Sequence, residues 1–198
     1  METNQFQQEI AIIKEMVEKT RKEAAGSGTF FILIGILSII NTLILMYLGI
    51  YKNGKYALPV IIVFTIVVVL TGVFMSRNQE KKMKVKTYAK KIFGHLGLSC
   101  AIPTLLVMFV FPFTKVFSFS LVPVFCSLIV GILLFTAGAI FEVRFVQICS
   151  LSWWIGAAII PYVPAIYSGF IMILMLLIGM ILPGYLFNRK YKKPEMRK

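Results

Sequence analysis

Six apolar stretches divide this chain of 198 residues, and each is long enough to cross a bilayer. An α-helix rises about 1.5 Å per residue, so a hydrocarbon core of about 30 Å is crossed by roughly 20 apolar residues. Apolar residues run continuously in segments such as 61–70, without the alternation that a transmembrane β-barrel requires. We therefore expect an all-α polytopic membrane protein, with spans at about residues 30–50, 56–75, 93–113, 121–141, 145–160 and 165–187.

Polar segments flank these spans. Residues 1–28 are expected to form a cytoplasmic amphipathic helix and a hinge, residues 29–188 the six-helix bundle, and residues 189–198 a basic cytoplasmic tail. One face of the amphipathic helix is marked by apolar residues at helical spacing, namely Phe6, Ile10, Ile13 and Val17. Such a face suits a protein partner, a second copy of the chain or the lipid surface.

Basic residues lie almost entirely on one side of the predicted membrane. The chain contains 21 Lys and Arg, and six alternating spans place 18 of them on the side that holds both termini. An excess of this kind is typical of cytoplasmic loops, so both termini are predicted to be cytoplasmic. The cations flank membrane spans and come without a zinc-finger or recognition-helix pattern, which favours anionic inner-leaflet lipid over nucleic acid as a partner.

Few polar groups lie at depth, and no Glu, Lys or Arg lies in the central part of any span. Ser and Thr hydroxyls there are expected to bond back to their own helix. The carboxamides of Asn41 and Gln147 are expected to make interhelical hydrogen bonds or, alternatively, to line a polar path. Trp153 and Trp154 fall in the middle of the fifth span, where an indole N–H needs an internal partner, so at least one should face another helix.

Three more polar residues lie at the predicted inner face. His95 begins the third span, and it is expected to be an interfacial histidine bonded to backbone or lipid phosphate, or else a pH-sensitive switch. Glu142 and Arg144 share the short turn between the fourth and fifth spans, at positions i and i+2 that do not face each other on a helix. Arg144 is expected to contact lipid phosphate, and Glu142 a cation of the second loop.

The composition excludes several classes of membrane enzyme. All acidic residues are Glu, which excludes a two-aspartate protease site, and a single His excludes a HExxH zinc site or a multi-histidine metal cage. Cys100, Cys126 and Cys149 are widely spaced and are expected to be packing residues. We expect no catalytic residue, no metal and no cofactor.

Two features predict how the spans pack. Small residues spaced by four occur in each of the last three spans, which predicts that these form the tightest part of the bundle: Ser127 and Gly131, Ser152 and Gly156, and Ala165 and Gly169. Pro103 lies near the middle of the third span and is expected to kink it.

Three longer segments carry a resemblance: IIKEMVEKTRKEAAGSGTFFILIGIL, FTAGAIFEVRFVQICSLSWWIGA and LPGYLFNRKYKK. With their order along the chain, they resemble an uncharacterised family of small six-span bacterial membrane proteins, seen especially in Bacteroidetes. Ile34 departs from the Trp that relatives often carry just before the glycine. The resemblance implies a six-span architecture and a bacterial cytoplasmic (inner) membrane, and it implies no activity.

The sequence thus favours a non-enzymatic membrane protein, acting through its cytoplasmic face as a scaffold or as a partner-binding or regulatory module. The alternative is a small transporter or channel for an uncharged or lipid-like solute, which Asn41, Pro103 and the Trp153–Trp154 pair would serve.

Overall fold

A computed structural model describes residues 28–51, 56–82, 88–114 and 117–191 as helices and their connecting turns. The predicted amphipathic helix with Phe6, Ile10, Ile13 and Val17 lies outside the described residues, as does the chain beyond residue 191. Within the described part, six helical spans are long and apolar enough to cross a membrane, which confirms the predicted all-α fold class and span number.

The first three spans each follow one predicted apolar stretch. They are α2 (Gly28–Tyr51), α3 (Ala57–Lys82), and α4 (Tyr88–Leu105) continued by the π turn η1 (Leu106–Val110). The predicted second span matches the apolar window Ala57–Phe74, and the helix α3 continues seven residues past residue 75. Arg, Gln, Glu and Lys favour helix in water as well, so the helix does not stop where the apolar stretch stops.

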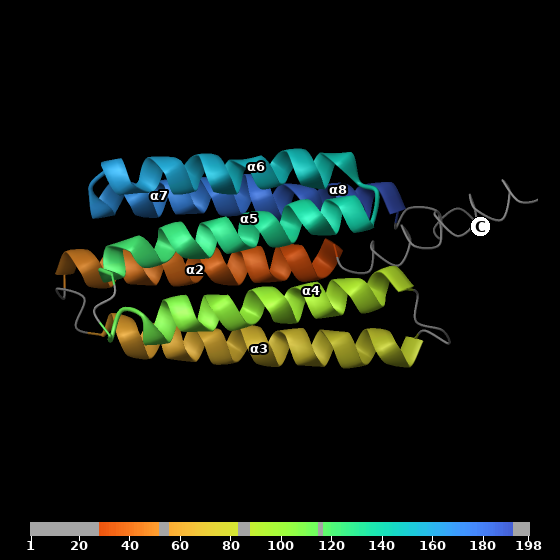
Figure 1. Ribbon diagram of the computed structural model, residues 1–198, viewed down its shortest axis with the longest axis horizontal. Coiled ribbons are helices and arrows are strands. Elements are labelled where there is room, and N and C mark those ends of the chain that lie inside the picture. Colours follow the sequence, from red (N-terminus) through yellow and green to blue (C-terminus); the bar gives the residue numbers. More distant parts are fainter. Residues whose placement is uncertain (1–27, 52–55, 83–87, 115–116, 192–198) are drawn as a thin grey trace, which may run out of the picture.

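The last three spans contain short irregular turns. They are η2 (Phe119–Leu121) with α5 (Val122–Ile140), α6 (Arg144–Ile159) with η3 (Ile160–Tyr162), and α7 (Ala165–Leu176), η4 (Leu177–Ile181) and α8 (Leu182–Tyr191) in succession. The spans alternate in direction, so α2, α4 and α6 begin at the end of the bundle where α3, α5 and α8 finish (Figure 1).

Both π turns precede a proline by two residues. In η1 the Phe111 N–H donates to the Leu106 carbonyl at 3.0 Å, ahead of Pro112, and in η4 the Leu182 N–H donates to Leu177, ahead of Pro183. A proline lacks an N–H and clashes with the carbonyl four residues earlier, and the wider π turn relieves that crowding. Pro103 lies inside α4, and the helix continues beyond it to Leu105.

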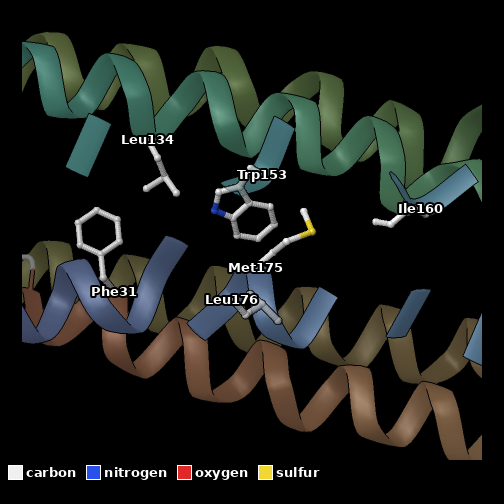
Figure 2. Close-up of a cluster of buried hydrophobic side chains, with 6 residues drawn as sticks. All are labelled: Phe31, Leu134, Trp153, Ile160, Met175 and Leu176. Carbon is white, nitrogen blue, oxygen red and sulfur yellow. The ribbon is translucent and has the colours of Figure 1, made fainter. Parts of the chain in front are cut away.

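Burial is uneven across the bundle. One third of the residues in the apolar windows of α6 and of the last span are buried, against none in the window of α3. This confirms that the last spans are the most tightly packed. The main core cluster joins four of the six spans (Figure 2), through Phe31 of α2, Leu134 of α5, Trp153 of α6, Ile160 of η3, and Met175 and Leu176 of α7.

Candidate functional site

Trp153 occupies the centre of the main core cluster, where it is only 3% exposed (Figure 2). It lies directly against Gly179 in the π turn of the last span, so closely that a Cβ on that glycine would collide with the indole nitrogen. The prediction that a tryptophan faces another helix is therefore confirmed. The prediction of a partner for its N–H is wrong among the described residues, where the buried Nε1 makes no hydrogen bond.

The backbone beside Trp153 also has an unusual hydrogen-bond pattern. Leu182 donates to Leu177, and the next donor in that series would be residue 183, which is a proline without an N–H. The Ile178 carbonyl therefore accepts no hydrogen bond from residue 183. The unpaired indole N–H of Trp153 and the π turn η4, which is followed by Pro183, thus lie side by side in the core.

Trp154 makes the opposite kind of contact. Its indole packs on Gly131 of α5, stacks on Phe135 with the ring centroids 5.5 Å apart, and donates from Nε1 to the Leu128 carbonyl at 3.4 Å. Here the predicted internal partner of the indole is present. The two adjacent tryptophans therefore join α6 to two different neighbours, α5 and the last span.

Asn41 lies near the middle of α2, and its side-chain oxygen is buried. The predicted interhelical hydrogen bond is absent among the described residues, because that oxygen has no partner there. A buried acceptor left unpaired costs about 1–3 kcal/mol. Asn41 is therefore a polar position that helix packing alone does not explain.

Gln147 is half-buried and packs against the end of α5. Its Cγ would lie 2.7 Å from a Cβ on Gly138, so the glycine allows the start of α6 to approach the end of α5. The hydroxyl of Ser150 donates to the Gln147 carbonyl at 2.7 Å. As predicted, hydroxyls at depth bond to their own helix, and the other examples are Thr65, Thr104, Ser127, Thr136 and Ser152.

Glu142 has a left-handed backbone, with φ of 53°, in the turn between α5 and α6. Its N–H donates to Ala139 at 3.1 Å, and the N–H of Val143 donates to Gly138 at 2.8 Å. This pair of bonds is a Schellman motif, whose left-handed position is usually glycine. A glutamate in this conformation is strained by about 1–2 kcal/mol. Strained backbone of this kind is concentrated at functional sites.

All Lys and Arg in the described part of the chain lie at one end of the bundle, which we call the basic end: Arg77, Lys81, Lys82, Lys90, Lys91, Arg144, Arg189 and Lys190. His95 also lies toward this end of α4, where its side chain is exposed. At the opposite end, Tyr162 is 88% exposed. The Lys and Arg that the structure describes are therefore confined to one end of the bundle.

The predicted positions do not form one site. Glu142, Arg144 and Gln147 share a turn at the basic end, whereas Trp153 and Trp154 lie deeper in α6 and Asn41 lies in the middle of α2. Among the described residues, no group of three or more His, Cys, Asp or Glu is placed to hold a metal ion.

Sequence analysis named Gly131 as a packing residue without connecting it to Trp154, and it did not single out Gly179. Gly179 and Gly131 belong to different spans from Trp153 and Trp154, so no spacing along the chain connects them. The only local signal was Pro183, four residues after Gly179, which indicates an irregular turn inside an apolar stretch.

No protein-family model matches the chain, and comparison with curated proteins and with solved structures gives no match.

Proposed function

We propose that this is a non-enzymatic multi-pass protein of the bacterial inner membrane, with both termini in the cytoplasm, which acts as a scaffold or partner-binding module through its basic end. One observation carries the proposal: every described Lys and Arg lies at the same end of the bundle. Cations concentrate on the cytoplasmic side of membrane proteins. The described helix ends that join the basic segments 83–87 and 192–198 also lie there, as does the start of α2, which follows residues 1–27 with their four cations and five glutamates.

The partner-binding part of the proposal rests on residues 1–28. This segment carries the apolar positions Phe6, Ile10, Ile13 and Val17, and it precedes α2, whose first residue lies at the basic end. An amphipathic helix in that place can bind an apolar groove of a protein or lie on the inner leaflet. Strongly basic surroundings favour an acidic partner or anionic lipid.

Orientation is tested by cysteine accessibility in a chain whose three native cysteines are replaced by alanine. A single cysteine replaces either Tyr162, at the end opposite the basic end, or Lys193 in the tail. We expect a membrane-impermeant maleimide to label Tyr162→Cys in intact cells and Lys193→Cys only after permeabilisation. The reverse pattern would overturn the proposed topology.

Partner binding is tested by proximity labelling in cells, combined with the oligomeric state of the purified protein. Ile10→Ser with Ile13→Ser removes the centre of the stripe, and Gln8→Ser with Glu15→Ser is the control on polar positions of the same segment. The first variant should lose neighbours or change oligomeric state, and the control should not. Unchanged results for both variants would exclude a role for the stripe.

A conduit for an uncharged solute is the second candidate, because Asn41 is a polar residue near the middle of a span and its oxygen has no partner among the described residues. That oxygen is buried, so a path past it would have to open between the helices, and polar residues inside a membrane commonly face the bundle interior or a water-filled cavity. Glycerol uptake by proteoliposomes, followed by light scattering, tests this idea. Uptake above that of empty vesicles, lost in Asn41→Leu, would support a conduit, and uptake equal to that of empty vesicles would remove it for this solute class.

A further inference from the structure

One face of α3 is exposed along its whole apolar length and leads into the basic end. None of the residues in its apolar window is buried. Four strongly exposed residues recur at helical spacing along one side: Val63 at 61%, Ile66 at 53%, Leu70 at 62% and Phe74 at 69%. At about 100° per residue these positions fall within a sector of about 80°, so they form one face.

Arg77 continues the same face. It lies seven residues, or about two turns, beyond Leu70 and is itself exposed. Lys81 follows four residues later, still within the helix, because α3 extends to Lys82. The apolar stripe therefore ends in two cations at i and i+4 on a continuous helix.

The depth of these cations matches the layer of lipid head groups. The apolar window of α3 is Ala57–Phe74, and Arg77 lies about 17 Å along the helix from its midpoint at 1.5 Å per residue. The hydrocarbon boundary lies about 15 Å from the bilayer centre, and the head-group layer extends about 5–8 Å further. Arg77 thus reaches phosphate level, and Lys81 lies about 23 Å from the midpoint, at the outer edge of that layer.

We propose that this face of α3 is a binding site for an anionic phospholipid of the inner leaflet. The acyl chain lies along Val63, Ile66, Leu70 and Phe74, the phosphate is bound by Arg77, and Lys81 adds a positive charge four residues further along the helix. Charge selects this occupant: a second copy of the chain would bring its own Arg77 and Lys81 to the same depth, where like charges repel, whereas an anionic head group is complementary. The proposal rests on the proposed orientation, which places the basic end at the inner leaflet.

A fluorophore on the stripe measures lipid selectivity at this face. In the cysteine-free chain, Leu70→Cys carries a bimane label, and its quenching by brominated phosphatidylglycerol is compared with quenching by brominated phosphatidylcholine. The control label is on Ile36→Cys, which is exposed on α2 at a similar depth and has no cation following it along its described helix. Two cations near an anionic surface contribute roughly 1 kcal/mol each, so we expect about 10- to 30-fold selectivity for phosphatidylglycerol at residue 70 and little at residue 36.

Charge variants identify the residues responsible. Arg77→Gln with Lys81→Gln should remove the selectivity, Arg77→Lys should retain most of it, and Lys192→Gln with Lys193→Gln removes as much charge from the tail and should leave it unchanged. Quenching by phosphatidylcholine in every variant shows that the face is still exposed to lipid. Glycerol 3-phosphate, which lacks acyl chains, should not compete.

Three outcomes would overturn the proposal. Equal quenching by both lipids at residue 70 would show that the face has no lipid selectivity. Selectivity that survives Arg77→Gln with Lys81→Gln would assign it to other residues. Absent quenching, together with cross-linking of Leu70→Cys between copies, would show that a second copy covers the face. The accessibility of Tyr162→Cys reports orientation independently. A reversed orientation with intact selectivity would move the lipid site to the outer leaflet, whereas lost selectivity with the expected orientation would remove the site alone.

Discussion

Trp153 lies against Gly179 with no space for a methyl group between the indole nitrogen and the α-carbon of the glycine. The contact joins α6 to the π turn of the last span at the centre of the core cluster. Both sides of the contact are rigid, since one is a planar ring and the other is backbone.

Gly179→Ala should therefore destabilise the protein, by about 1–3 kcal/mol for overpacking. Gly72→Ala is the matched control, because a Cβ at Gly72 in α3 has no neighbour within 4 Å, and alanine favours helix by about 0.5–1 kcal/mol. Thermal unfolding in detergent should show a lower melting temperature for the first variant only. Equal melting temperatures would mean that the ring moves aside freely.

Leucine in place of Gly131 or Gly156 should also lower detergent stability, and more strongly at Gly131. A side chain at Gly131 meets the rigid indole of Trp154, whereas at Gly156 it meets the flexible Met175 side chain, which can adopt another rotamer. Gly49→Leu, at a position in α2 where a Cβ would have no neighbour within 4 Å, serves as control. Unchanged stability of the Gly131 and Gly156 variants would contradict the assigned packing.

Asn41→Leu should raise the stability of the purified chain, because it removes a buried acceptor without a partner. The gain is about 1–3 kcal/mol less any strain from the branched side chain. Chemical unfolding with a graded denaturant in mild detergent measures it. A clear loss of stability would instead show that the Asn41 oxygen receives a hydrogen bond in the membrane-embedded protein.

Glu142→Gly should be more stable than Glu142→Ala by about 1 kcal/mol. Both variants lose the carboxylate, so their difference isolates the left-handed backbone that glycine adopts freely and alanine does not. The comparison uses melting temperatures measured under identical detergent conditions. Equal melting temperatures for the two variants would show that the turn relaxes to another conformation.

The three cysteines should react in an order set by burial. Cys126 is buried in α5, and Cys100 and Cys149 are partly exposed on α4 and α6. Mass spectrometry after brief treatment with N-ethylmaleimide in detergent should find adducts on the latter two first. Early modification of Cys126 would indicate that α5 separates from its neighbours.

Hydropathy predicted the span number and fold class correctly, since apolar length is a property of each segment alone. It located the second membrane span but not the end of the helix α3, because residues 76–82 favour helix without being apolar, and helix propensity does not end at the membrane surface. The prediction that at least one of Trp153 and Trp154 faces another helix followed from their depth in the span. The contact of Trp153 with Gly179 could not be predicted, because it depends on how the last span packs against α6.

The candidate site was predictable only in its parts. Sequence singled out Glu142 and Arg144 as members of a tight turn, but the left-handed conformation of Glu142 depends on the closeness of α5 and α6, which Gly138 and Gln147 permit. The absence of a partner for Asn41 depends on neighbours from other spans. Polar residue types therefore indicated where to look, and tertiary packing decided which of them remained unpaired.

The π turn of the last span holds five residues per hydrogen-bonded turn where an α-helix holds four. It is equivalent to a single inserted residue, stored inside a span whose two ends stay in place. If the turn became regular α-helix with all its residues retained, α8 would rotate by about 100° relative to α7, whereas deleting one residue from Leu177–Ile181 would leave α8 near its present orientation. The first change would turn Gly184 away from Gly28, so the starts of α2 and α8 keep their contact only while the extra residue is held in the π turn.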